Sequence, residues 1–339
     1  TFVNKGNITV GNIHTKEGVY EIRYAGQGAT TVRLTDPNKL PNDKHPQTPE
    51  VRVATKVFPT RQANVVAVVD VMIVITPDAY ADLGNDSDAA GALVALMIEE
   101  ANDAYENSNV SMRLNLVRAT IINDFVYNDS GDLQDDLDMF SSRIPSVRNR
   151  LGPYARDQRE EYDADIMTLL VKDGGGSCGI AWQMNEGNER GFSPLAYNVV
   201  DTDCISNYSF AHELGHNMGL GHDRDNAETT PRHSYSYGYQ DPRGRFRTIM
   251  SYPCDGVECT RIPFFSNPDI LYQGIPFGTA EENNARTLRN TRFVVAEYSE
   301  NQGGGSSADS GSSESAARDL TKSYGVSDRQ NTDTFVSFF

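Results

Sequence analysis

Positive charge is scarce in this chain of 339 residues. The sequence has 30 Lys and Arg against 47 Asp and Glu, which gives a net charge of −17. Because binding to a polyanion needs a basic surface, this balance argues against nucleic acid and anionic membranes as partners. The chain also lacks a run of 18 apolar residues, so we predict no transmembrane helix. Its first ten residues lack the basic flank and apolar core of a signal peptide.

Cysteine is equally scarce, and no cysteine lies in the first 177 positions. The four cysteines are Cys178, Cys204, Cys254 and Cys259. They form no C-x-x-C pair, which argues against a zinc ribbon or a thioredoxin motif. An even number within one region favours two disulfides in an oxidising compartment, and therefore a secreted protein. Proximity favours Cys178–Cys204 and Cys254–Cys259 among the three possible connectivities, and four buried thiols in a cytosolic protein are the alternative.

Changes in residue pattern divide the chain into four parts. Residues 1–60 alternate apolar and polar side chains between Gly, Asn and Pro, which predicts a small β-rich segment. This segment ends in a polar, Pro-rich stretch, Lys39–Glu50, which we expect to be an exposed connector. Residues 61–300 form the main domain. Residues 301–317 are a Ser/Gly linker by composition, and residues 318–339 are a C-terminal tail.

The main domain alternates strand and helix patterns, which predicts a three-layer α/β fold. Ser87 is a candidate N-cap for the first long helix. The expected strands are Val65–Thr76, Met112–Ile122, Ala164–Asp173, Gly179–Met184 and Leu195–Asp201. The expected helices are Ser87–Ser108, an interrupted helical region over Asp132–Glu161, and Thr279–Glu300.

Three of the six histidines lie in one short stretch, FAHELGHNMGLGHD. On a helix, His212 and His216 lie one turn apart on one face, so their imidazoles can share a zinc ion. Glu213 lies beside that ion without having to bind it, and can act as a general base. Gly219 can adopt positive φ, end the helix and turn the chain, so that His222 reaches the same metal as a third ligand.

The extended motif HELGHNMGLGHD resembles the zinc motif of the metzincin endopeptidases. Asp223, after the third histidine, resembles the reprolysin or adamalysin branch. TIMSYP resembles the metzincin methionine turn, with Met250 as its methionine. FSNPDILYQGIPFG and ENNAR look most like bacterial secreted reprolysin-like proteases, including the peptidyl-Asp metalloendopeptidases. The resemblance implies a mixed, mostly parallel sheet with helices, an active-site helix and a methionine turn.

Two further stretches bear on the substrate. GIAW resembles the edge strand that lines the metzincin substrate cleft, which implies that Gly179, Ile180 and Ala181 bind substrate. Tyr252, two residues after Met250, resembles the astacin and serralysin branches instead. Its role stays open between packing, zinc binding and a hydrogen bond to the transition state.

The resemblance implies a secreted, zinc-dependent endopeptidase that hydrolyses proteins or peptides, with Glu213 as general base toward a zinc-activated water. We expect a monomer. Two alternatives are a non-catalytic interaction module on the same scaffold and a zinc hydrolase of small peptides. A preference for an acidic residue after the cut would need a basic pocket residue, for which the candidates are Arg245, Arg247 and Arg261. Calcium is possible near the acidic cluster Asp132, Asp135 and Asp136.

Residues 1–60 resemble the end of a propeptide, and are a possible intramolecular inhibitor of a zymogen. They contain no cysteine, so a cysteine block of the metal is excluded. Asp36, Asp43 or His45 could occupy the open zinc position, and a folding aid without metal contact is the alternative. His14 and His233 are expected to be ordinary surface or loop histidines.

Overall fold

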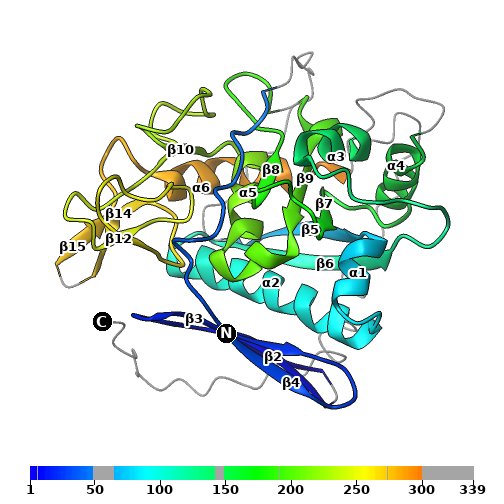
Figure 1. The fold of residues 1–339 in the computed structure, drawn as a ribbon. Helices are drawn as coiled ribbons and strands as arrows, with labels where there is room; N and C mark the ends of the chain where they lie inside the picture. Colours follow the sequence, from blue (N-terminus) through cyan, green and yellow to red (C-terminus); the bar gives the residue numbers. More distant parts are fainter. Residues whose placement is uncertain (6, 49–64, 142–148, 190, 273, 300–339) are drawn as a thin grey trace.

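The computed structural model describes residues 1–5, 7–48, 65–141, 149–189, 191–272 and 274–299. Two units of secondary structure follow one another along the chain (Figure 1). The expected linker at 301–317 and tail at 318–339 lie outside the described residues, as does the junction at 49–64.

The first unit is a four-stranded antiparallel sheet in the order β1-β2-β3-β4. Its apolar–polar alternation leaves one face buried, because Ile8 and Val10 pack with Ala92 and Leu96 of helix α2. Figure 1 shows the sheet lying beneath α2, apart from the second sheet. The strands are β1 (Phe2–Lys5), β2 (Ile8–Thr15), β3 (Gly18–Tyr24) and β4 (Thr30–Thr35).

The second unit is built on a five-stranded mixed sheet in the order β6-β5-β7-β9-β8. All neighbouring pairs are parallel except β8 with β9, so the edge strand β8 runs against the others. The interior strand β7 is buried throughout and reads as a continuous apolar run, as a strand covered on both faces should. The strands are β5 (Ala67–Ile75), β6 (Met112–Ile121), β7 (Ile166–Val171), β8 (Gly179–Ala181) and β9 (Tyr197–Asp201).

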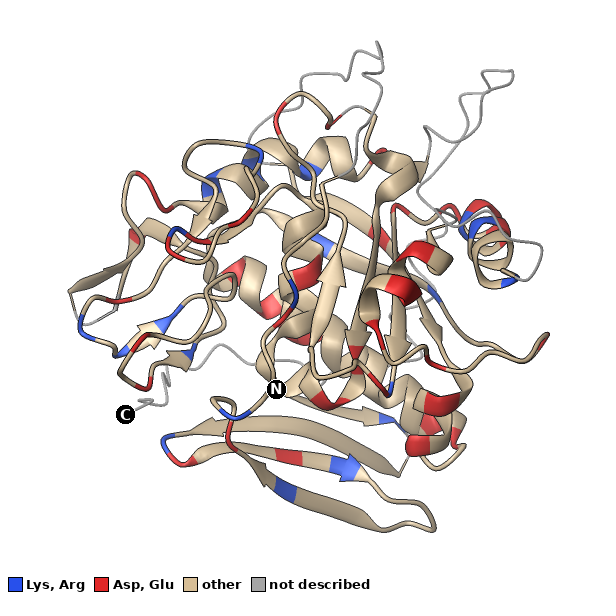
Figure 2. Ribbon diagram, turned by 45° about the horizontal axis from the view of Figure 1, so that its top comes forward, with Lys and Arg blue, Asp and Glu red and all other residues tan. Residues whose placement is uncertain are grey.

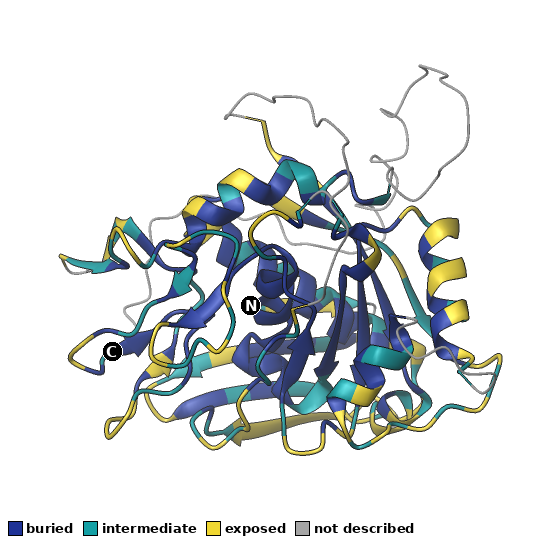
Figure 3. Ribbon diagram, turned by 90° about the horizontal axis from the view of Figure 1, so that it is seen from above, coloured by how far each residue is buried: buried dark blue, intermediate teal, exposed yellow. Residues whose placement is uncertain are grey.

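Helices pack around this sheet, and Figure 3 shows buried strands at the centre with exposed residues on the outer helix faces. The α-helices are α1 (Pro77–Asp82), α2 (Ser87–Asn107), α3 (Leu133–Phe140), α4 (Leu151–Glu161), α5 (Ser209–Asn217) and α6 (Asn284–Val295). Two 3-10 helices are η1 (Ser193–Leu195) and η2 (Thr202–Asn207). The short strands after α5 are β10 (Gly221–Asp223), β11 (Tyr237–Gly238), β12 (Phe246–Arg247), β13 (Thr260–Arg261), β14 (Asn267–Tyr272) and β15 (Ile275–Phe277).

The mixed α/β fold class is confirmed, with a difference in the first long helix. Its N-cap is Asp86 rather than Ser87, because the Asp86 carboxylate accepts hydrogen bonds from the backbone N–H groups of Asp88 and Ala89. The expected helical region over 132–161 is two helices, α3 and α4, and residues 142–148 between them lie outside the described residues.

Two disulfides join the cysteines in the pairs that proximity favoured. Cys178–Cys204 ties the start of β8 to η2, with 5.4 Å between the Cα atoms. Cys254–Cys259 closes a short loop, with 5.7 Å between the Cα atoms. The acidic residues are spread over many helices and loops rather than gathered on one element (Figure 2). Among the described residues, no helix combines the length and apolar character that crossing a membrane requires.

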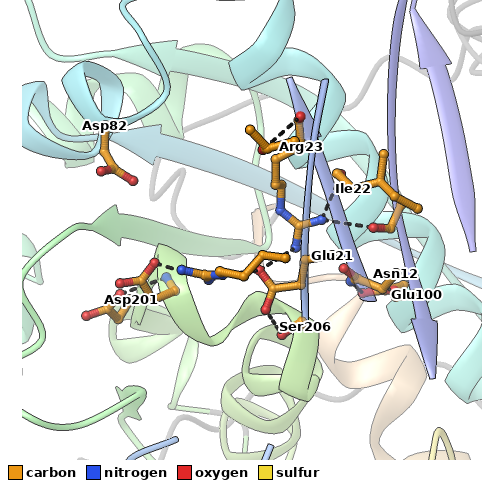
Figure 4. A network of polar contacts seen from close by, with 12 residues as sticks. Asn12, Glu21, Ile22, Arg23, Asp82, Glu100, Asp201 and Ser206 are labelled. Atoms are coloured by element: carbon orange, nitrogen blue, oxygen red, sulfur yellow. Dashed lines mark hydrogen bonds and ion pairs between the residues drawn. The ribbon is translucent and has the colours of Figure 1, made fainter. Parts of the chain in front are cut away.

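Polar contacts join the N-terminal sheet to the α/β unit (Figure 4). The Asn12 amide donates to both carboxylate oxygens of Glu100 on α2, at 2.9 and 3.1 Å. The Ser206 hydroxyl donates to Glu21 at 2.8 Å, and Arg23 lies 3.8 Å from the same carboxylate. The sheet therefore contacts both α2 and the 3-10 helix that precedes α5.

His14, expected to be an ordinary surface or loop histidine, is half-buried and belongs to this interface. Its ring stacks on Tyr208 with centroids 4.9 Å apart, because strand β2 faces the chain just before α5. Burial, with the charge of the amino terminus, lowers the pKa of His14 to about 4. Burial also raises the pKa of Glu100 to about 7, against the opposing effects of Asn12 and the amino terminus.

These opposite shifts predict opposite pH slopes for docking of the sheet. In Glu100→Gln, His14 titrates alone, and docking should strengthen as the pH rises from about 4 to 6.5. In His14→Gln, Glu100 titrates alone. The contribution of Glu100 to docking of the sheet is complete below about pH 4.5 and should be lost as the pH rises to about 7. Hydrogen exchange of residues 1–35, corrected for intrinsic rates, measures docking, and slopes of the same sign in both variants would contradict this account.

Candidate metal centre and substrate cleft

Helix α5 carries the histidine motif and is fully buried. Asn217 at its end anchors it to the sheet, donating to the backbone carbonyls of Trp182 and Tyr197 at 2.8 and 3.0 Å. Gly219 has φ of 97°, a conformation that favours glycine, and turns the chain after the helix. Strand β10 then brings His222 back to the helix, as the spacing predicted.

The Nε2 atoms of His212, His216 and His222 lie 3.1 Å from one another in all three pairs. The Nδ1 atom of His212 is 2.9 Å from the carbonyl of Ile249, and that of His216 is 2.9 Å from the carbonyl of Leu220. A carbonyl only accepts, so each Nδ1 carries the proton and each Nε2 presents a lone pair. Lone pairs facing one another at this distance repel, unless a cation lies between them.

Burial keeps these imidazoles neutral. It lowers the pKa of His212 to about 4, and lowers the pKa values of His216 and His222 well below the usual range. Neutral imidazole is the form that binds a metal ion. The three nitrogens form a candidate metal group, and the described residues add no fourth ligand to it. Three nitrogen ligands with one open position are the donor set of a catalytic zinc site, so these residues fit zinc.

Glu213 is completely buried, and neither carboxylate oxygen has a hydrogen-bond partner among the described residues. Burial and the nearby Asp43 raise its pKa well above the usual range. The carboxylate lies against the backbone of Gly179 on the edge strand, because a Cβ built on Gly179 would be 2.5 Å from Oε1. The space that this glycine leaves open is therefore filled by the carboxylate of Glu213.

Gly179→Ala is expected to lower kcat for peptide hydrolysis by about tenfold or more while the zinc content stays the same. The added methyl group would displace the carboxylate, and small misplacements of catalytic groups are costly. Gly91→Ala on α2 is the matched control, because the added methyl group would meet only the flexible end of the Lys5 side chain, and it should stay within about threefold of the wild type. Unchanged kcat in Gly179→Ala would show that the position of Glu213 does not limit the reaction.

Met250 lies under the histidine helix and is fully buried. It sits in a turn in which the N–H of Ser251 donates to the carbonyl of Thr248 at 3.0 Å. A Cβ at Gly215 of α5 would be 2.6 Å from the Met250 sulfur, so the glycine permits this close packing. The preceding residue, Ile249, supplies the carbonyl that orients His212.

Tyr252 packs on the third histidine, with 4.3 Å between its ring centroid and that of His222. Its hydroxyl donates to the backbone carbonyl of Asp43 at 2.5 Å. Asp223 accepts a hydrogen bond from the Tyr252 backbone N–H at 2.9 Å and so holds this turn beside β10. The hydroxyl therefore faces the chain segment that lies in front of the histidines.

That segment, residues 42–47, lies along the edge strand and corrects in part the expectation that Lys39–Glu50 is an exposed connector. Gln47 forms a parallel bridge with Trp182, and Figure 1 shows the chain after β4 passing beside α5 and β8. Pairing with an unpaired strand edge buries Asp43 and Pro46, although their polar, Pro-rich surroundings predicted exposure, while Asn42 stays exposed. Four backbone hydrogen bonds of 2.7–3.1 Å make the contact: Cys178 N–Asn42 O, Lys44 N–Gly179 O, Gln47 N–Ala181 O and Gln183 N–Gln47 O.

The three residues proposed to block the metal lie in different surroundings. Asp36 pairs with Lys39 at 3.3 Å, near the surface. His45 pairs with Glu228 at 3.2 Å, and its ring lies 5.4 Å from that of His222. Asp43 is 2% exposed, and its Oδ2 lies 3.0 Å from Arg261 and 3.7 Å from Nδ1 of His212. Among the described residues, it groups with His212 and Glu213, not with the three imidazoles.

The acidic cluster considered for calcium has protein partners. Asp132 contacts Lys44 at 2.5 Å and caps α3 through the Gln134 N–H at 2.8 Å. Asp136 is buried and accepts from the Tyr127 hydroxyl at 2.5 Å. The structure therefore gives no support to calcium there. His233 stacks on Tyr235 with centroids 4.9 Å apart.

Sequence comparison agrees with this site. Residues 66–266 match the sequence profile of metallo-peptidase family M12, and the chain belongs to this family. It is a zinc metalloendopeptidase, and the reprolysin-like resemblance is confirmed.

Two relatives are named peptidyl-Asp metalloendopeptidase. One, from Stenotrophomonas maltophilia, is 30% identical over 308 residues, covering 87% of this chain and 69% of the relative. Another, from Pseudomonas aeruginosa, is 34% identical over 254 residues, covering 68% of this chain and 40% of the relative. A solved structure described as a chaperone-substrate complex has a TM-score of 0.52 and 17% identity, covering 88% of this chain and 41% of that one. This likeness concerns the fold alone.

Several residues of the site were not predicted. Asn217 anchors α5, and the carbonyls of Ile249 and Leu220 fix the imidazole tautomers. Asn217 follows His216 directly in the motif, and an amide side chain at that position of a buried helix could have been predicted to hydrogen-bond to the sheet. Backbone carbonyls carry no sequence signal at all.

Proposed function

We propose that this chain is a secreted zinc endopeptidase in which His212, His216 and His222 bind the metal and Glu213 is the general base. The observation that carries the proposal is the convergence of three imidazole Nε2 atoms, 3.1 Å from one another in all three pairs. Zinc bound there supplies a Lewis acid that polarises the scissile carbonyl and acidifies water. The two disulfides support an oxidising compartment.

The protein's own groups divide the remaining work. The Glu213 carboxylate accepts a proton from the attacking water and returns it to the leaving amine. Strand β8 holds an extended substrate by main-chain hydrogen bonds at Gly179 and Ala181, as it now holds residues 42–47. The Tyr252 hydroxyl donates a hydrogen bond to a substrate carbonyl, as it now donates one to the backbone carbonyl of Asp43. Met250 supports the imidazoles from below.

The N-terminal segment acts as an intramolecular inhibitor in this proposal. Residues 42–47 take up the hydrogen-bonding edge of β8 that a substrate needs, and Asp43 lies beside His212 and Glu213. The chain is therefore a zymogen that acts on substrates as a monomer after residues 42–47 have left the cleft. The relatives' name supports peptide bonds next to aspartate as substrates.

Hydrolysis of denatured casein with and without a zinc chelator tests the function. We expect cleavage that stops with the chelator and returns when zinc is added. Cleavage that the chelator leaves unchanged would contradict the role of zinc. Hydrolysis of short peptides but not of casein would favour the small-peptide hydrolase. An inert protein, even after residues 1–60 are cut away, would favour the interaction module.

A further inference from the structure

One buried arginine in the cleft has its acidic partner on the N-terminal segment. Arg261 is 3% exposed, and its Nη2 lies 3.0 Å from Oδ2 of Asp43. Both side chains are buried, with 2% of Arg261 and 1% of Asp43 exposed. The two residues therefore form a buried ion pair between the segment and the catalytic unit.

Without the segment, Arg261 keeps only neutral partners among the described residues. Its guanidinium donates to the backbone carbonyls of Asn207 at 2.9 Å and Ser251 at 3.3 Å, and its Nε has no partner. Arg247 lies opposite it in the β12–β13 register and is also buried. An uncompensated buried charge is costly, more so beside a second one. A catalytic unit that keeps such a charge facing its cleft is suited to receiving an anion.

The other arginines near this site are differently placed. Arg245 is fully engaged by Asp241, with its Nε and Nη2 each 2.6 Å from a carboxylate oxygen. Arg247 donates to the carbonyl of Ser251 at 2.5 Å and contacts no carboxylate in the described part of the chain. Of the three arginines, Arg261 alone therefore contacts a carboxylate that lies in the cleft.

Asp43 also lies next to the candidate catalytic groups. Its carboxylate lies within 4.8 Å of ligand atoms of His212 and Glu213, and its own backbone carbonyl accepts from Tyr252. The flanking residues pair with β8, since the N–H of Lys44 donates to the carbonyl of Gly179 at 2.7 Å. An extended peptide that carries an acidic side chain at the place of Asp43 would therefore have its acidic residue next to the catalytic groups.

We propose that Arg261 determines the specificity of this enzyme. Its guanidinium receives an acidic substrate side chain next to the scissile bond. Asp43 occupies its subsite in the intact chain as a substrate-like side chain, rather than as a ligand of the metal. Arginine suits this role because its guanidinium stays charged and binds carboxylates directionally. The proposal rests on the endopeptidase function proposed above and adds the residue that selects the substrate.

The test uses the chain purified whole and then cut at a protease recognition sequence inserted within residues 49–64, so that the catalytic unit has folded with its segment. Two peptides that differ only in Asp or Asn at one position are compared by kcat/KM. The wild type should prefer the Asp peptide by about 100-fold. Arg261→Gln should reduce this ratio to below about tenfold and keep hydrolysis of the Asn peptide. Arg245→Gln is the matched control and should keep the wild-type ratio.

A wild-type ratio that persists in Arg261→Gln overturns the proposal. So does a wild type that cuts both peptides equally, in which case the endopeptidase function stands. A cut wild type that hydrolyses neither peptide, and casein neither, after residues 1–48 have been separated from it refutes the endopeptidase function, and the Arg261 assignment falls with it.

If Arg261→Gln fails to fold, Asp43→Asn in the uncut chain decides, because Arg261 stays in place. Loss of the ion pair should raise the activity of this chain by about tenfold or more over the wild type. Asp36→Asn, which alters a carboxylate paired with Lys39 near the surface, is the control and should leave the activity unchanged. Equal activity of the two variants overturns the proposal.

Discussion

Replacing Glu213 with Gln is expected to lower kcat/KM for peptide hydrolysis by about 10²–10⁴-fold without changing the zinc content. Glutamine has nearly the same shape but cannot accept the proton of the attacking water. The three imidazoles form a candidate metal group that does not include Glu213, so zinc should stay bound. The measurement is peptide hydrolysis by the cut chain, with metal analysis of the same sample.

Glu100→Gln is the matched control, because it makes the same change in a buried glutamate of α2 that accepts hydrogen bonds from Asn12 and, among the described residues, belongs to neither candidate metal group. It should keep the catalytic activity of the cut chain within about twofold. Normal turnover in Glu213→Gln would remove Glu213 from the mechanism. Loss of zinc together with activity would make it a structural support of the site instead.

Cutting the chain between residues 49 and 64 is expected to raise activity by about 100-fold or more after dilution to nanomolar concentration. A tethered segment has an effective concentration of the order of millimolar at its own cleft, and cutting followed by dilution removes this advantage. The segment now covers the edge of β8 through four backbone hydrogen bonds and one buried ion pair.

The control carries the same inserted sequence and is left uncut. Adding the separated residues 1–48 back at micromolar concentration should restore inhibition of the cut chain. Equal activity before and after cutting would contradict latency and favour a folding aid. Inhibition that persists at any dilution would show that the N-terminal sheet stays docked on the catalytic unit after cutting, through contacts such as Asn12 with Glu100. The docked sheet would then keep residues 42–47 in the cleft.

The convergence of the three histidines could be predicted because local geometry governs it. The spacing of His212 and His216 places them on one helix face, and Gly219 supplies the positive φ that brings back His222. The main strands were predictable for the same reason, since their apolar runs have lengths typical of buried strands.

The path of residues 42–47 was not predictable. A polar, Pro-rich stretch has no periodicity, and its partner is a strand edge far along the chain. The ion pair between Asp43 and Arg261 follows from that path, so the sequence could only name Arg261 as one of three candidates. The N-cap of α2 was missed because Asp86 and Ser87 are adjacent and both can cap a helix.

Zinc analysis of the wild type and His222→Ala, purified side by side with zinc present, tests the central claim most directly. The account predicts about one zinc ion per wild-type chain and a large loss in His222→Ala, because two imidazoles alone bind the ion weakly. His233→Ala, which removes a histidine outside the site, should keep the wild-type content. Equal zinc in the wild type and His222→Ala would contradict the three-histidine metal centre.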